Sequence, residues 1–145
     1  MTGVGGHILN VASMAAIVPA PGMAVYGATK HAVLGYTLAL AGELRGRTPA
    51  ITVGALCPDA IDTDMVKNVQ DQDASSILFS AGHLLTVDRV ADAAVEMIED
   101  RQLMRTLPPG RAAMAQALRP FPAFGLRLLE QFTRVGRKHR RQRTT

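Results

Sequence analysis

The chain has 145 residues, 48% of them hydrophobic, a composition typical of one globular domain that excludes an intrinsically disordered chain. Its net charge of +4 hides a division: five basic residues stand against eleven acidic ones through Asp100, and eleven against one from Arg101 onward. No apolar run is long enough to span a bilayer, and the single Cys57 excludes an intrachain disulfide, so we expect a cytoplasmic location.

Five elements are predicted in chain order. Residues 7–12 and 51–57 are short apolar runs typical of buried strands, and residues 24–45 form a long helical pattern between them. This strand–helix–strand order predicts a parallel pair with a right-handed crossover. A helix over 87–100 and a short strand over 103–107 follow, whereas the polar and small residues between 59 and 85 predict irregular structure.

Tyr26 and Lys30 lie four residues apart, so they fall on one face of the predicted helix. A lysine ammonium beside a tyrosine favours the phenolate form, which allows such a tyrosine to exchange a proton with a substrate oxygen near neutral pH. Ser13 lies thirteen residues ahead of Tyr26, and a serine hydroxyl can form a hydrogen bond with the same oxygen. These three residues therefore predict a proton-transfer site.

The segment that carries these residues resembles the catalytic segment of the short-chain dehydrogenase/reductase family. The resemblance rests on the N-x-x-S strand end at Asn10–Ser13, the apolar Pro/Gly loop, the Y-x-x-x-K pair and the spacing between Ser13 and Tyr26. It implies an α/β fold with part of a doubly wound, Rossmann-like parallel sheet. It covers about residues 6–109, so we expect the C-terminal half of such a domain over 1–109 and a basic amphipathic helical tail over 110–145.

The resemblance also implies an activity and the roles of the residues. The family transfers hydride between a nicotinamide cofactor, NAD or NADP, and a small-molecule carbonyl or alcohol substrate. Tyr26 is then the general acid/base, Lys30 supports Tyr26 and holds the nicotinamide ribose, and Ser13 orients the substrate oxygen. No histidine has a partner at metal-ligand spacing, so no metal site is expected.

The stretch from Pro58 to Thr63 matches the family's P-G-x-x-x-T turn, which lies against the nicotinamide. Asp59 stands where the family has glycine, and Thr63 keeps its place. The resemblance therefore assigns Pro58, Asp59, Ile61 and Thr63 to cofactor binding, together with Tyr26 and Lys30.

The glycine-rich strand-to-helix turn with which the family cradles the cofactor pyrophosphate is missing from the sequence. Gly3–Gly6 is rich in glycine, but it precedes a strand and does not link a strand to a helix. The family's catalytic asparagine upstream of the serine strand is also missing. We therefore expect a truncated reading frame, a fragment or a degenerate relative with impaired activity. The alternative is a non-catalytic remnant that acts as an interaction or membrane-surface module.

The residues beyond 110 combine an apolar stripe with basic charge. Three readings stay open for this tail: packing on the rest of the domain, contact with an anionic membrane surface, and, least favoured, binding of nucleic acid through phosphates. No recognition motif or aromatic stacking platform supports nucleic acid, so none is expected as a partner. The stripe consists of Phe121, Phe124, Leu128, Phe132 and Val135, and the basic residues near it are Arg127, Arg134, Arg137, Lys138, Arg140, Arg141 and Arg143.

The helix predicted over 24–45 is apolar around most of its circumference, which is typical of a helix buried on more than one side. One side can pack on the sheet, and a second copy of the chain is the simplest cover for the other. Members of the resembled family commonly pair through this helix. We therefore expect a homo-oligomer.

Overall fold

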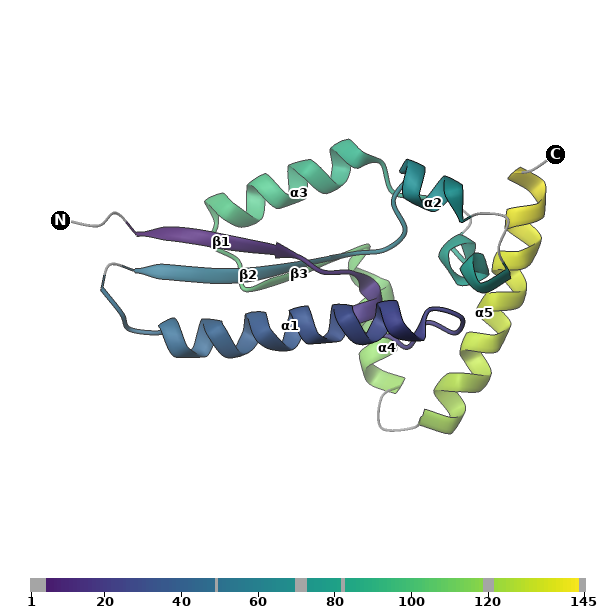
Figure 1. Ribbon diagram of the computed structural model, residues 1–145, viewed down its shortest axis with the longest axis horizontal. Helices are drawn as coiled ribbons and strands as arrows, with labels where there is room; N and C mark the ends of the chain where they lie inside the picture. The colour runs from purple at the N-terminus through teal and green to yellow at the C-terminus, as the bar shows by residue number, and fades with distance from the viewer. Residues whose placement is uncertain (1–4, 49, 70–72, 82, 119–121, 144–145) are drawn as a thin grey trace.

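The structure is a computed structural model that describes residues 5–48, 50–69, 73–81, 83–118 and 122–143. Its centre is a parallel sheet in the order β1-β2-β3, formed by β1 (Gly6–Val11), β2 (Ile51–Pro58) and β3 (Met104–Leu107) (Figure 1). β2 pairs with β1 from Ile51 to Leu56 and with β3 from Ala55 to Pro58. The expected α/β fold with part of a doubly wound parallel sheet is confirmed.

Helices cover both faces of the sheet. α1 (Ala24–Leu44) runs along one face and α3 (Val87–Glu99) along the other (Figure 1). Because side chains alternate along a strand, β2 contributes to two cores. Ala55 and Cys57 belong to the core against which Val33 and Leu34 of α1 pack, and Leu56 belongs to the core with Ala93 and Met97 of α3. The crossover helix and the second helix therefore bury opposite faces of one central strand.

The predicted elements agree with the structure to within a residue, but the prediction for residues 59–85 was wrong. Residues 59–85 contain α2 (Asp64–Asn68) and the 3-10 helix η2 (Asp73–Phe79). Elsewhere in the chain, a further 3-10 helix, η1 (Met14–Ala16), follows β1. Ser75 and Ser76 of η2 are buried. Small polar residues are typical of loops in a sequence, but here these two are buried where another helix crosses the backbone at Ser76.

That crossing helix is α5 (Pro122–Arg143), which follows α4 (Pro109–Leu118) and packs against η2 (Figure 1). Gly136 is buried at the crossing, and a Cβ there would collide with the carbonyl oxygen of Ser76. Nδ1 of His139 lies 3.2 Å from the carbonyl oxygen of Phe79. The side chain missing at Gly136 therefore allows α5 to lie directly on η2.

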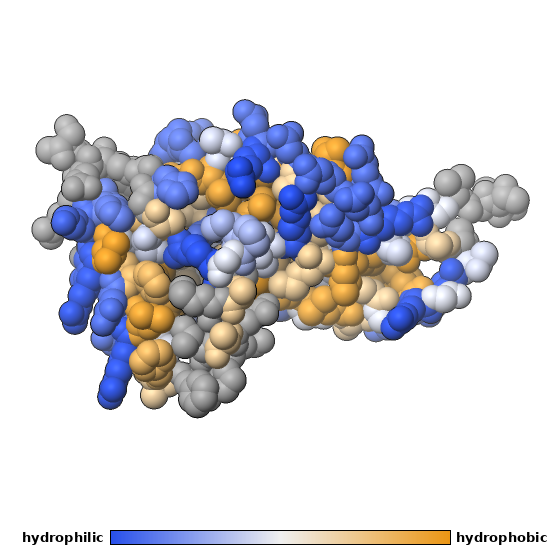
Figure 2. Space-filling view, turned by 180° about the vertical axis from the view of Figure 1, so that it is seen from behind, coloured by the Kyte–Doolittle hydropathy of each residue, from blue (hydrophilic) through white to orange (hydrophobic). Residues whose placement is uncertain are grey.

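The apolar stripe of α5 divides between two environments. Leu128 and Phe132 are half-buried, Phe124 and Val135 are exposed, and Phe121 lies outside the described residues. Figure 2 shows blue side chains along the outer edge of this helix and orange ones on the side nearer the body of the molecule. None of the helices in the described part of the chain is both long and apolar enough to cross a membrane.

Candidate active site

The residues that the sequence predicts as a site line one cavity of about 670 Å³. It lies at the carboxyl ends of β1 and β2, where ligands bind in open α/β sheets. Helix α1 begins beside it, so the first turns of α1 also face it. The predicted residues in its wall are Ser13, Tyr26, Lys30, Pro58, Asp59, Ile61 and Thr63.

Ser13 is held at the end of β1 by the backbone. The strand pairing continues past β1, because the Ala12 N–H donates to the Leu56 carbonyl oxygen at 2.8 Å. Ser13 then caps η1, and its Oγ accepts a hydrogen bond from the Ala15 N–H at 3.1 Å. That bond uses a lone pair of Oγ, so the hydroxyl proton remains able to donate to an oxygen in the cavity.

Tyr26 and Lys30 project from the first two turns of α1, and both are half-buried. Nζ of Lys30 lies 5.8 Å from the centroid of the Tyr26 ring. The same Nζ donates a hydrogen bond to the carbonyl oxygen of Val11 at 3.2 Å. The end of β1 therefore fixes the ammonium group beside the tyrosine ring.

Cys57 lies behind this group and is fully buried. Burial raises the pKa of the Cys57 thiol, and a hydrogen bond from the Ser13 backbone and the positive charge of Lys30 partly oppose that rise. A buried thiol whose pKa is raised is a poor nucleophile. Among the described residues, no three His, Cys, Asp or Glu side chains come together in a way that could hold a metal ion.

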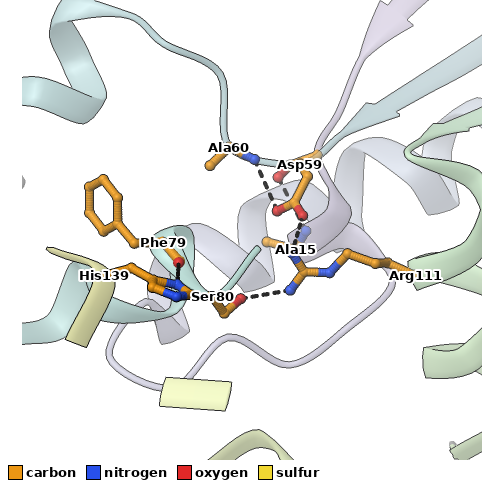
Figure 3. Close-up of polar contacts among 8 residues, drawn as sticks. Ala15, Asp59, Ala60, Phe79, Ser80, Arg111 and His139 are labelled. Carbon is orange, nitrogen blue, oxygen red and sulfur yellow. Dashed lines mark hydrogen bonds and ion pairs between the residues drawn. The ribbon is translucent and has the colours of Figure 1, made fainter. Parts of the chain in front are cut away.

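Asp59 is held by two partners in the turn after β2 (Figure 3). Its Oδ1 accepts from the Ala60 N–H at 2.9 Å, and its Oδ2 lies 2.7 Å from Nη1 of Arg111 in α4. Nη2 of Arg111 donates to Oγ of Ser80 at 2.7 Å. The carboxylate at the family's glycine position is therefore neutralised by an arginine from a distant part of the chain.

Arg111 is a further residue of the site that no sequence motif indicates. Arg111 lines the same cavity as Tyr26, yet it belongs to α4 and follows a Pro-Pro-Gly stretch with no motif around it. The available signal was Asp59 itself, since a carboxylate in a partly buried turn requires a partner. The sequence alone did not indicate which of the many arginines supplies it.

The end of the turn is fixed by a short parallel bridge between Ile61 and Leu85. The Asp62 N–H donates to the Leu85 carbonyl oxygen at 2.8 Å, and the Leu85 N–H donates to that of Ala60 at 2.9 Å. Thr63 follows in an extended conformation and is the N-cap residue of α2. The structure therefore brings Thr63 to the cavity wall at the start of α2.

Comparison with known proteins identifies relatives of this chain. Residues 1–74 match the short chain dehydrogenase family. The chain is similar to "Uncharacterized oxidoreductase YxjF" of Bacillus subtilis, with 33% identity over 110 residues that cover 66% of this chain and 42% of that protein. It is also similar to "Fat body protein 2" of Drosophila melanogaster, with 27% identity over 106 residues that cover 71% of this chain and 41% of that protein.

A third relative extends the similarity toward the C-terminal helices. "Probable oxidoreductase EphD" of Mycobacterium tuberculosis is 30% identical over 132 residues, which cover 83% of this chain and 22% of that protein. The chain thus spans about two fifths or less of the length of these curated relatives. The match over residues 1–74 includes Ser13, Tyr26 and Lys30 as well as the turn from Pro58 to Thr63. This chain belongs to the short chain dehydrogenase family.

Proposed function

We propose that the cavity interconverts a carbonyl compound and the corresponding alcohol. The observation that carries this proposal is the position of the Lys30 ammonium, 5.8 Å from the centroid of the Tyr26 ring, in a cavity that Ser13 also lines. In the reducing direction the Tyr26 hydroxyl gives its proton to the substrate oxygen. Oγ of Ser13 donates a hydrogen bond to that oxygen, and the ammonium of Lys30 stabilises the tyrosinate left behind.

The cofactor proposed for this reaction is NAD or NADP, which supplies or accepts the hydride when bound. The donors in the cavity fit the nicotinamide end, because Lys30, Tyr26 and the Thr63 hydroxyl can bond ribose or carboxamide groups while Ile61 and Pro58 offer apolar surface. The pairing of Asp59 with Arg111 also supports the fit, since it balances the carboxylate charge. These residues are therefore proposed to hold the nicotinamide end of the cofactor.

Two tyrosines of α1 make the test of this proposal specific. Tyr26→Phe should lower the rate of carbonyl reduction by about 10²-fold or more, the usual scale of general acid catalysis. Tyr36→Phe is the matched control, because Tyr36 lies on the same helix and is 63% exposed. The measurement is oxidation of NADH or NADPH by a panel of ketones and aldehydes. Equal rates for both variants would reject Tyr26 as the proton donor.

A second copy of the chain is the partner proposed for α1. Apolar side chains remain uncovered along this helix, with Val25 80% exposed, Tyr36 63% and Leu38 41%. Exposed apolar surface of this kind favours association. Sedimentation at micromolar concentration is the measurement, and a Val25→Glu, Tyr36→Glu double variant should shift the chain toward the monomer.

The outer face of α5 supports a second candidate function at a membrane surface. Phe124 is 59% exposed and Val135 43%, and the neighbouring Arg127, Arg134 and Arg137 are exposed. An apolar and basic helix face of this kind can bind anionic lipid. Co-sedimentation with anionic vesicles should then fall with added salt and should be lost in an Arg134→Glu, Arg137→Glu variant. Binding that is the same for the variant and the unchanged chain would remove this candidate.

A further inference from the structure

The two ends of the cavity differ in the polarity of the side chains that line them. The reactive end contains Ser13, Tyr26 and Lys30 at the strand ends and the start of α1. The other end is formed by α2, η2 and α5, which gather at one side of the molecule (Figure 1). The side chains that these elements place in the wall are apolar, among them Val66 of α2, Ile77 and Leu78 of η2, and Leu128, Leu129 and Phe132 of α5.

The charged side chains in the cavity wall come from elements other than α2, η2 and α5. Three lining residues carry charge, namely Lys30, Asp59 and Arg111. Asp59 and Arg111 form an ion pair with each other, and Arg111 also donates to Ser80. Nζ of Lys30 donates to the Val11 carbonyl oxygen. Lys30 keeps its other N–H donors for the reactive end. Among the described residues, α2, η2 and α5 contribute no charged side chain to the wall, so the apolar end offers a charged substrate group no partner.

Helix α5 is fixed in its position on the apolar end. Gly136 permits its close crossing over η2, and His139 contacts the carbonyl oxygen of Phe79 one turn later (Figure 3). Leu128, Leu129 and Phe132, on the turns before Gly136, are half-buried and face the cavity. The apolar end is therefore built by an anchored helix.

We propose that the substrate is a neutral carbonyl compound or alcohol with a hydrocarbon chain, and that this chain lies against α2, η2 and α5. The inference rests on the proposed function, which places the reacting oxygen between Ser13 and Tyr26. A volume of about 670 Å³ is within the usual range of small-molecule sites. A hydrocarbon group in such a cavity gains affinity in proportion to the apolar surface that it buries.

Calorimetric titration of the 145-residue chain with straight-chain 2-alkanones of increasing length tests the proposal without any need for turnover. Affinity should rise about fourfold for each added methylene until the apolar end is filled. A straight-chain keto acid of the same length, with its carboxylate at the end remote from the carbonyl, should bind at least tenfold more weakly, because the apolar end offers no charged partner. Affinities that do not change with chain length, or keto acids that bind as well as ketones, would overturn the proposal.

Two phenylalanines of α5 give a matched pair of variants. Phe132→Ser should weaken binding of the longest ketone about tenfold, whereas Phe124→Ser should leave it unchanged, since Phe124 is 59% exposed and is not part of the wall. If Phe132→Ser fails to fold, Phe132→Leu should still weaken binding of the longest ketone two- to fivefold and leave the shortest unaffected. Equal affinities for the Phe132 and Phe124 variants would contradict the assignment of α5 to the substrate site.

This experiment also separates the substrate class from the reaction. Tyr26→Phe should keep the dependence of affinity on chain length even if it abolishes turnover. Binding without any Tyr26-dependent reduction would reject the proposed reaction and leave the apolar ligand class intact. Tyr26-dependent reduction without a chain-length effect would reject the ligand class alone.

Discussion

Oδ2 of Asp59 lies 2.7 Å from Nη1 of Arg111, and this ion pair joins the turn after β2 to the first turn of α4. The two side chains are 15% and 28% exposed, so solvent screens them only in part. Arg111 also reaches Ser80, directly after η2. A single guanidinium therefore connects the turn assigned to the cofactor with the segment on which α5 packs.

Breaking this ion pair should destabilise the protein more than removing both charges. Asp59→Asn or Arg111→Gln alone leaves a partly buried charge without its partner, and we expect each variant to lose about 1–3 kcal/mol of unfolding free energy. The double variant should lose less unfolding free energy than the two single variants lose together. Urea denaturation of the four proteins yields the coupling energy directly.

The exposed contact between Lys67 and Asp62 is the control for this cycle. These groups lie 3.5 Å apart, but their side chains are 58% and 53% exposed. An Asp62→Asn, Lys67→Gln cycle should give a coupling energy below about 1 kcal/mol. Equal coupling in the two cycles would show that burial does not strengthen the Asp59–Arg111 pair.

Replacement of Gly136 by alanine should loosen α5. Alanine normally stabilises a helix relative to glycine by about 1 kcal/mol, but here the added Cβ would strike the Ser76 carbonyl oxygen. We expect a net loss of stability and faster proteolysis within α5. Gly35→Ala in α1 is the matched control, since a Cβ there meets nothing within 4 Å and the usual gain should appear. A stabilised Gly136→Ala protein would contradict the close crossing of α5 over η2.

The stability of the fold should depend on pH through His7. Burial, followed by the charge of Arg101, lowers the pKa of His7 from its ordinary value of 6.5. Its Nε2 is buried and meets no hydrogen-bond partner among the described residues, so protonation is disfavoured in the folded state. The unfolded chain therefore binds more protons than the folded one just below pH 6.5.

It follows that the unfolding free energy should be constant above about pH 6.5 and should fall as the pH decreases from there to the lowered pKa of His7. Thermal melts between pH 5 and pH 8 measure this dependence. His7→Gln should reduce the slope in that window. A slope that is the same in the variant would assign the effect to other groups.

Thr37 should stabilise the contact between β1 and α1. It is fully buried, accepts a hydrogen bond from Nδ2 of Asn10 at 2.9 Å, and donates to the Val33 carbonyl oxygen at 2.7 Å. Thr37→Val leaves the Asn10 amide without this acceptor and should cost about 1–3 kcal/mol of unfolding free energy. Thr133→Val is a suitable control, because Thr133 bonds only to the Leu129 carbonyl oxygen of its own helix in the described contacts. Similar losses for the two variants would argue against a role of the Asn10–Thr37 bond.

The sequence predicted those parts of the fold that depend on local pattern. The apolar strand runs, the cap residue Thr86 and the spacing of Tyr26 and Lys30 are local signals, and the elements that they predict lie within a residue of the structure. The contact between Asp59 and Arg111 could not be predicted in this way, because it depends on how α4 returns to the sheet. Packing of the tail on the domain was one of the readings that the sequence allowed, but η2 could not be predicted as its partner. The close approach of Gly136 to Ser76 depends on two backbones that are distant in sequence.

The central position of β2 has a consequence for the order in which the chain opens. β2 is hydrogen-bonded on both sides, to β1 and to β3, and its residues from Val53 to Pro58 are buried. The outer strands can each detach and leave the other pair in place, whereas β2 can be released only when both pairings are lost. In native-state hydrogen exchange, the amides of Ala55, Leu56 and Cys57 should therefore exchange last, at the rate of global unfolding, while those of α5 exchange earlier through local opening.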